Sequence, residues 1–271
     1  MDSCCYLKAV VLDWAGTTID HGSRAPAIVF QEIFRERGIE ITQAQAREPM
    51  GMAKREHIAA IGSMNDVARA WQDKYGQPPS DDDFDSMYED FLPLQKKTLR
   101  DHCRLIDGVA EAVRECREMG LRIGSSTGYT RELMEVVSEA AGRQGYQPDC
   151  VICAEDAPRG RPAPFLLYEA AMRLDVYPLW SIVKVDDTEV GIQAGRNAGC
   201  WTVGVTRTGN CVGLSVEEVN ALSDQEQRRL CHEAGETLKA SGAHFIVESV
   251  TGIPAVLDVI ERRAARGELP I

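Results

Sequence analysis

The chain has 271 residues, enough for one large domain or two smaller ones with a substantial apolar core, and a formal net charge of −12. This acidic balance argues against a nucleic-acid partner, because phosphate backbones are bound by clustered Lys and Arg. The first apolar run meets Asp13 too soon to form a signal peptide or a membrane span, so we expect a cytoplasmic protein without a membrane partner.

The first predicted element is a strand over residues 7–15, "LKAVVLDWA". Between residues 21 and 102 no comparable strand appears. Apolar residues recur there at helical spacing over 26–38, over 41–62 with a break at Pro49, and over 83–101, and "GQPPSDDD" predicts a turn and a helix start. An insertion of this length is too long for a loop, so we expect a helical domain lying over the end of the strand.

After residue 100, short β-rich runs alternate with amphipathic stretches. The predicted strands are 121–127, 149–156, 181–187 and 200–206. The predicted helices are 130–145, 164–175 and 189–199, with a long polar helical region after the last strand. This pattern predicts an α/β fold, a Rossmann-like parallel sheet with helices on both faces. We assign residues 1–20 and 103–271 to this core and 21–102 to an inserted helical cap domain.

Nine cysteines, an odd number scattered along the chain, suit reduced thiols better than a disulfide framework. Cys150 and Cys153 have C-x-x-C spacing, but they lie in a predicted strand, and no second such pair or His pair completes a zinc site. We therefore expect both to be buried structural residues.

Polar side chains fall where the predicted strands end or the helices begin: Asp13, Thr127 with Gly128, Arg161, and Asp186 with Asp187. Because parallel strands present their carboxyl ends to one edge, these residues are expected to converge. Singly, each has an ordinary alternative as a helix cap, a surface cation or a solvated turn. Jointly, a nucleophilic carboxylate, a hydroxyl with a backbone N–H, a cation and a second carboxylate make a site for a phosphoryl group and Mg²⁺.

In this order the motifs resemble those of the haloacid dehalogenase-like hydrolases, over nearly the whole chain. Within that superfamily, "DWAGTTID", "PMGMAKREH", "STGYTRELM", "GRPAP" and "GRNAGCWTVGV" are similar to the phosphonoacetaldehyde hydrolases, or phosphonatases. The resemblance implies an enzyme that hydrolyses the C–P bond of a small-molecule phosphonate, giving acetaldehyde and orthophosphate, with Mg²⁺ as cofactor. It also implies a homodimer, which the apolar face of residues 25–34 favours because a small helical domain is poorly able to bury it alone.

The resemblance implies a role for each candidate. Asp13 is the nucleophile, Lys54 forms a Schiff base with the aldehyde, and His57 is a candidate proton shuttle. The phosphate and substrate are expected to contact Thr127, Gly128, Arg161, Met50 and Tyr129, and Mg²⁺ to be held by Asp13, the backbone carbonyl of Ala15 and Asp187. A structural role for His57 and ordinary packing for Met50 and Tyr129 are the alternatives.

The residue at position 15, Ala15, agrees with a reaction in which the leaving group departs from phosphorus as carbon. Many superfamily phosphatases carry an Asp there that protonates a departing oxygen, whereas this chain has Ala15. An iminium on Lys54 accepts the electrons of a C–P bond, so no such acid is needed. To be half neutral near pH 7, a Lys must lower its pKa by roughly 3 units from about 10.4, and burial and neighbouring cations have to supply most of that shift.

The stretch "DDTEVG" departs from the superfamily pattern. Asp186 stands where Gly is usual, and Gly191 stands where a second Asp is expected. Register assigns Asp187 to the metal and leaves Asp186 and Glu189 open as supporting groups.

Two alternative functions remain at this point. One is a Mg²⁺-dependent phosphate-ester phosphatase, against which Ala15 and Lys54 argue. The other is a non-catalytic metabolite-binding relative, which would be expected to lose Asp13 or Lys54.

Overall fold

The computed structural model describes residues 6–270. One sheet holds six parallel strands in the order β3-β2-β1-β4-β5-β6. The strands are β1 (Ala9–Leu12), β2 (Arg122–Ser126), β3 (Cys150–Ile152), β4 (Ile182–Asp186), β5 (Trp201–Val205) and β6 (Phe245–Val247). Strand order reverses between β1 and β4, and in open parallel sheets such a switch point is where ligands bind.

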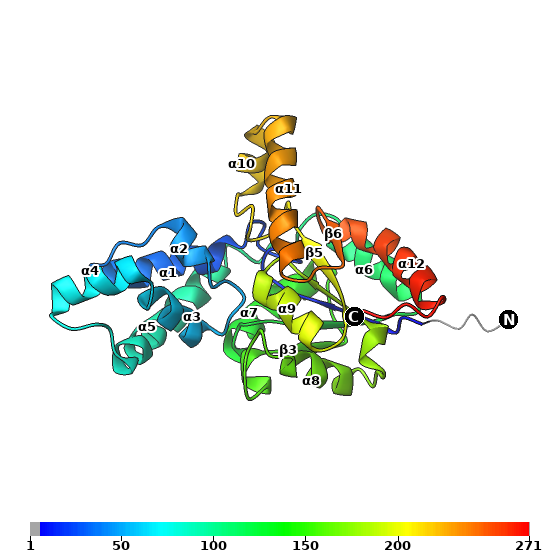
Figure 1. The fold of residues 1–271 in the computed structure, drawn as a ribbon, viewed down its shortest axis with the longest axis horizontal. Coiled ribbons are helices and arrows are strands. Elements are labelled where there is room, and N and C mark those ends of the chain that lie inside the picture. The colour runs from blue at the N-terminus through cyan, green and yellow to red at the C-terminus, as the bar shows by residue number, and fades with distance from the viewer. Residues whose placement is uncertain (1–5, 271) are drawn as a thin grey trace.

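The helices fall into two groups (Figure 1). Those of the insertion are α1 (Arg24–Glu36), α2 (Gln43–Arg47), α3 (Lys54–Gly62), α4 (Asn65–Tyr75) and α5 (Asp81–Leu99). Those of the sheet region are α6 (Val109–Glu118), α7 (Arg131–Arg143), α8 (Phe165–Arg173), α9 (Glu189–Asn197), α10 (Val216–Ala221), α11 (Asp224–Ala240) and α12 (Ile253–Ala264), with short 3-10 turns η1 (Ala154–Asp156), η2 (Leu179–Ser181) and η3 (Val250–Gly252). Within residues 6–270, none of the helices combines the length and the apolar character needed to cross a bilayer.

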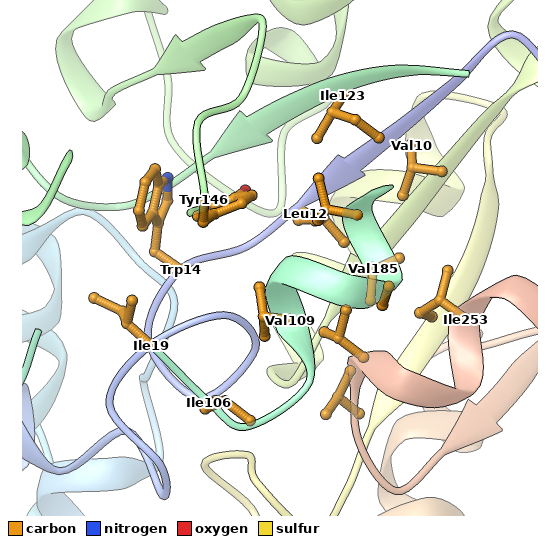
Figure 2. Packing of buried hydrophobic residues seen from close by; sticks show 14 of the residues in the cluster. Val10, Leu12, Trp14, Ile19, Ile106, Val109, Ile123, Tyr146, Val185 and Ile253 are labelled. Carbon is orange, nitrogen blue, oxygen red and sulfur yellow. The ribbon is translucent and has the colours of Figure 1, made fainter. Parts of the chain in front are cut away.

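Alternate residues of β1 pack on opposite faces of the sheet, as the two-residue period of a strand requires. Val10 and Leu12 join a cluster with α6, α7 and α12, whereas Ala9 and Val11 pack with α8. Figure 2 shows the first cluster, in which Trp14 packs edge-on against Tyr146 with ring centroids 5.0 Å apart. Because Trp14 is fully buried, the turn that follows β1 is fixed, and with it the position of the preceding Asp13.

The insertion has an apolar core of its own. Phe30 of α1, Ile58 of α3 and Phe91 of α5 belong to one buried cluster that is separate from those of the sheet. In Figure 1 helices α1 to α5 lie together at one end of the molecule, and α5 contacts α7 of the sheet region. An ion pair of 2.8 Å joins Lys96 of α5 to Glu132 of α7.

The α/β fold class and the five predicted strands are confirmed. Four elements were not predicted from the sequence: β6, α4, α6 and α12. β6 has three residues, two of them only half-buried, which is too short for a periodic pattern. In α4 only Val67 and Trp71 are buried, so the apolar signal is sparse. Cys150 and Cys153 are buried and free, as expected.

Candidate active site

Three carboxylates meet at the switch point of the sheet. Leu12 of β1 pairs with Val185 of β4, so Asp13 follows one strand beside the Asp186–Asp187 pair at the end of the other. The backbone N–H of Asp13 donates to the carbonyl of Val185 over 3.0 Å. One oxygen from each of the three carboxylates lies within 4.8 Å of the others, and all three residues are buried.

The three carboxylates of this cluster outnumber the two cations that contact them, Arg161 and Lys184. Burial, and next the charge of Asp186, raise the pKa of Asp13. Burial and then the charge of Asp13 raise the pKa of Asp187 well above its usual value. Carboxylate oxygens are hard ligands that suit divalent cations, and a bound cation would compensate the buried charge. The cluster therefore fits a divalent metal site.

Asp187 is held by the turn that follows β1 and by a loop near β5. Thr17 Oγ1 donates to Asp187 Oδ1 over 3.0 Å, and the N–H of Asn210 donates to Oδ2 over 2.8 Å. Gly16 has a φ of +83°, and a Cβ there would lie 2.2 Å from Asp187 Oδ2. Glycine at this position therefore lets the turn close over the carboxylate.

Arg161 bridges two of the carboxylates. Its Nη2 lies 2.7 Å from Asp13 Oδ1 and its Nη1 lies 3.2 Å from Asp186 Oδ2. Nη2 also donates to the carbonyl and to Oγ of Ser126. Nε is buried without a hydrogen-bond partner, so the guanidinium keeps a donor available for a ligand oxygen.

The turn after β2 brings Thr127 and Gly128 to the same edge. Thr127 is not the cap of α7, the alternative considered for it, because that cap is Thr130. Instead Thr127 Oγ1 accepts from the N–H of Tyr129 over 3.1 Å. A Cβ at Gly128 would lie 2.6 Å from the carbonyl oxygen of Met52, so this turn presses directly against the insertion.

Burial also rules out the other ordinary alternatives. Arg161 is only 4% exposed, so it is not a surface cation. Asp13 is no helix cap, and the Asp186–Asp187 pair is not a solvated turn.

Lys54 is the first residue of α3 and reaches this edge from the insertion. Its Nζ lies 5.5 Å from the Phe30 ring centroid and 5.0 Å from that of Tyr129. Burial is the main cause that lowers its pKa to about 7; Asp13 opposes the shift and Arg161 adds to it. A substantial share of the amine is therefore neutral near pH 7.

His57 lies one turn along α3 from Lys54 and is fully buried. Nε2 lies 2.9 Å from the carbonyl oxygen of Ala46 and therefore donates to it, which leaves Nδ1 as an acceptor without a partner. Burial and then the charge of Lys54 lower the pKa of His57 well below 6.5, so the ring is neutral. Its ring lies against Phe30 in a tilted arrangement, with centroids 3.7 Å apart.

A small cavity of about 20 Å³ joins the insertion to the sheet. Its lining includes Asp13, Ala15, Met50, Lys54, Thr127, Gly128, Tyr129 and Arg161. These are all of the predicted site residues except His57, which does not line the cavity, and Asp187, which lies beside it in the carboxylate cluster.

Besides Thr17 and Asn210, two further residues of the site were not predicted from the sequence, and one residue that was left open lies outside it. Lys184 is fully buried in β4, and its Nζ lies 2.8 Å from Asp186 Oδ2; a lysine inside an apolar strand was the available signal. Ser126 accepts from Lys184 and had no signal of its own. Glu189 is exposed and accepts from Ser241, so it does not support the carboxylate cluster.

Comparison with known proteins assigns the family. A family model for haloacid dehalogenase-like hydrolases matches residues 7–199. A phosphonoacetaldehyde hydrolase of Paraburkholderia phytofirmans is 44% identical over 98% of this chain and 99% of its own length. One from Nitratidesulfovibrio vulgaris is 45% identical over 97% of this chain and 94% of its own length.

The fold agrees with this assignment. The crystal structure of a phosphonoacetaldehyde hydrolase-like protein from Oleispira antarctica, 41% identical, matches with a TM-score of 0.96 and covers 100% of this chain and 99% of that one. The chain is therefore a hydrolase that belongs to the haloacid dehalogenase-like hydrolases and, within them, to the phosphonoacetaldehyde hydrolase family.

Proposed function

We propose that this enzyme hydrolyses the C–P bond of phosphonoacetaldehyde to acetaldehyde and orthophosphate. The observation that carries the proposal is the position of Lys54, a buried amine with a pKa of about 7, in one small cavity with Asp13 and Arg161. An ordinary phosphate-ester phosphatase has no use for a neutral amine at this place. The relatives described as phosphonoacetaldehyde hydrolases support the same substrate.

The reaction begins on Lys54. Its neutral amine adds to the aldehyde and loses water, giving an iminium. The Asp13 carboxylate then attacks phosphorus, and the electron pair of the C–P bond moves toward the iminium to form an enamine. Without that electron sink, expulsion of a carbanion from phosphorus is prohibitively slow.

Two hydrolyses complete the turnover. The enamine takes a proton on carbon to return to an iminium, and water then releases acetaldehyde and the free Lys54 amine. Water also attacks the Asp13 aspartyl phosphate, releasing orthophosphate and regenerating the carboxylate. His57 is a candidate for moving protons between these species, because its Nδ1 is an unpartnered acceptor one helical turn from Lys54.

The phosphoryl group is held by Arg161 and by the turn at Thr127 and Gly128. Mg²⁺, bound by Asp13, Asp187 and the backbone carbonyl of Ala15, would neutralise charge on the phosphoryl oxygens. Met50 and Tyr129 enclose the organic part of the substrate, and both line the cavity.

Residues 21–102 act as a cap that opens to admit substrate. A cavity of about 20 Å³ has room for about one water molecule, far less than the substrate needs. Its walls come from both parts of the chain, Met50 and Lys54 from the insertion and Arg161 from the sheet region. Separation of these walls enlarges it, and closure then excludes water from the iminium.

A homodimer is also inferred, and it rests on the family resemblance. The apolar face of residues 25–34 packs mostly inside the insertion, with Phe30, Ile33 and Phe34 buried there, and leaves Ile28 42% exposed. Sedimentation at micromolar concentration is expected to give twice the chain mass of 29.9 kDa. A single species at the chain mass would remove the inference.

Chemical trapping tests the proposed reaction. Borohydride added with phosphonoacetaldehyde or acetaldehyde should reduce the imine, label Lys54 in a peptide map and inactivate the enzyme. Phosphonoacetate, which lacks the aldehyde, should release no phosphate. Lys54→Arg should lose C–P cleavage although it keeps the charge, because a guanidinium does not readily give up its proton. Near-normal cleavage by Lys54→Arg would refute the imine, and release of phosphate from simple esters at comparable rates would favour the phosphatase alternative.

A further inference from the structure

Four buried polar side chains at the carboxyl edge of the sheet form a closed ring. Lys184 Nζ lies 2.8 Å from Asp186 Oδ2, which lies 3.2 Å from Arg161 Nη1. Arg161 Nη2 and Lys184 Nζ both donate to Ser126 Oγ, each over 3.1 Å, and close the ring. All four residues are at most 4% exposed.

The ring divides the guanidinium of Arg161 between two carboxylates. Nη1 faces Asp186, while Nη2 lies 2.7 Å from Asp13 Oδ1. An arginine fork favours two parallel hydrogen bonds to a single carboxylate. If Asp186 were absent, the fork would be free to close on Asp13 with both arms. Both oxygens of that carboxylate would then be occupied, and it would be a poor nucleophile.

Asp186 is itself tightly fixed. Its Oδ1 accepts from the N–H and from Oγ1 of Thr188, over 3.0 and 2.7 Å. Its Oδ2 faces Lys184 and Arg161. Asp186 also belongs to the three-carboxylate cluster, but its oxygens lie against Thr188, Lys184 and Arg161, so we assign this carboxylate to these protein groups.

The place of Asp186 also accounts for Gly191 in α9. A Cβ at Gly191 would lie 2.0 Å from Asp186 Cγ, and 2.1 and 2.2 Å from its two oxygens. Gly191 does not have a left-handed φ, so the carboxylate, and not the backbone, is what requires glycine. Side chains at positions 186 and 191 would therefore occupy the same space, which has room for one carboxylate. This explains why the chain departs from the superfamily pattern at both positions together.

We propose that Asp186 and Lys184 are positioning residues that act through Arg161. Asp186, held by Lys184, draws one arm of the guanidinium away from Asp13, so that Asp13 is not bound by both arms, and Nε of Arg161 stays without a protein partner and can donate to a phosphate oxygen. Lys184 supplies the charge that allows a further carboxylate beside Asp13 and Asp187. The inference rests on the nucleophilic role proposed for Asp13.

The test measures binding of inorganic phosphate to the Mg²⁺-loaded protein by calorimetry. Asp186→Asn should weaken phosphate binding by about tenfold, because the fork closes on Asp13. Lys184→Met should weaken it as well, because Asp186 then loses its ion pair with Lys184 and draws the guanidinium of Arg161 more strongly to itself. In an Arg161→Ala background Asp186→Asn should change phosphate binding by less than about twofold, as expected of a residue that acts through Arg161. Asp90→Asn, the same chemical change in an exposed pair with Arg37, is the control and should leave phosphate binding unchanged.

A second probe separates positioning from metal binding. Mn²⁺ affinity, measured by electron paramagnetic resonance, should change by less than about threefold in Asp186→Asn. Loss of Mn²⁺ binding would make Asp186 a metal ligand and overturn the proposal. Unchanged or tighter phosphate binding in Asp186→Asn, or equal losses with and without Arg161, would overturn it as well.

An exchange variant keeps the proposal testable if a single variant fails to fold. Asp186→Gly combined with Gly191→Asp returns one carboxylate to the shared pocket and preserves the net charge. It should bind phosphate more tightly than Asp186→Gly alone, within about threefold of the natural protein; failure to recover would contradict the proposal. Neither phosphate nor Mn²⁺ contains a C–P bond, so these results stand whether or not the enzyme cleaves phosphonoacetaldehyde.

Discussion

Lys54 Nζ lies 5.0 Å from the centroid of the Tyr129 ring, so an aromatic side chain of the sheet edge covers the amine that the insertion supplies. The face of an aromatic ring attracts a cation by about 0.5–2 kcal/mol, which opposes neutralisation of the amine. Removal from water has the larger effect and lowers the pKa of Lys54 to about 7. Tyr129 contributes to that burial, since its own side chain is almost wholly enclosed.

The first prediction concerns the pH dependence of imine formation on Lys54. Only the unprotonated amine reacts, and its fraction falls about tenfold per pH unit below the pKa. With a pKa of about 7, the rate of borohydride-trapped labelling by acetaldehyde should level off above pH 8 and fall steadily toward pH 5. Labelling of Lys97, in the last turn of α5, is the internal control and should be far slower at pH 7. A midpoint above pH 9 for Lys54 would contradict the prediction.

The second prediction compares two helical glycines. Gly191→Ala places a Cβ about 2 Å from the Asp186 carboxylate, so it should lower the free energy of unfolding by at least 1–3 kcal/mol and impair phosphate binding. At Gly142 in α7 an added Cβ would meet no atom within 4 Å. Gly142→Ala should therefore raise the free energy of unfolding by about 0.5–1 kcal/mol, because Ala loses less conformational entropy than Gly in a helix. Urea denaturation of both variants checks the pair, and equal effects would show that Asp186 does not fill the space at Gly191.

The sequence located the site because strand ends have a general geometry. A polar residue that follows an apolar strand, such as Asp13 or Asp187, is brought to one edge by any parallel sheet. That rule needs no knowledge of side-chain contacts, and the structure does bring Asp13, Thr127, Arg161 and Asp187 together.

The sequence did not reveal how the charges inside the site are arranged. Lys184 and Ser126 lie 58 positions apart and meet only because β2 and β4 flank β1. Whether Arg161 binds one carboxylate or two depends on side-chain conformations that no local pattern encodes. Gly191 showed a departure from the superfamily, but its cause is a steric contact with Asp186 that appears only in three dimensions.

The third prediction concerns the two segments that join the insertion to the sheet region. His102 Nδ1 donates to Asp20 Oδ1 over 2.9 Å, and the other oxygen of Asp20 accepts from the N–H of Ala25. The hydrogen bond to Asp20 is the main cause that raises the pKa of His102 above 6.5; burial and the charge of Arg24 oppose it. The protonated ring is thus favoured in the folded state.

Because folding raises the pKa of His102, protonation of this residue stabilises the folded state. The extra stabilisation is fully present below pH 6.5, the usual value for an unfolded chain, and is lost as pH rises through the folded pKa of His102. His102→Asn should therefore lower the free energy of unfolding more at pH 6 than at pH 9. Comparing variant and natural protein at each pH cancels the titration of other groups. A larger loss of the free energy of unfolding at pH 9 than at pH 6 would mean that the pKa of His102 is lowered on folding, and would contradict the prediction.

The last prediction separates the two effects of the Asp187 charge. Without metal, an ionised Asp187 is unfavourable, because burial and the nearby Asp13 charge raise its pKa well above the usual value. A raised carboxyl pKa means that the folded state loses stability as pH rises through the ordinary range of an Asp toward the folded value. Asp187→Asn removes that cost, so in chelator at pH 7.5 the variant should unfold at a higher urea concentration than the natural protein.

With Mg²⁺ the order should reverse. A ligand that binds only the folded state stabilises it by about 2.7 kcal/mol at a concentration of 100 Kd, and Asp187→Asn should forfeit most of that gain together with turnover. Asn keeps one oxygen, which can accept from Thr17 or from the N–H of Asn210, so the variant keeps the size of the side chain but loses the charge and one of these two hydrogen bonds. Urea denaturation with Mg²⁺ and with chelator gives both comparisons. Equal Mg²⁺ stabilisation of the two proteins, or full activity of Asp187→Asn in excess chelator, would remove Asp187 from the metal site.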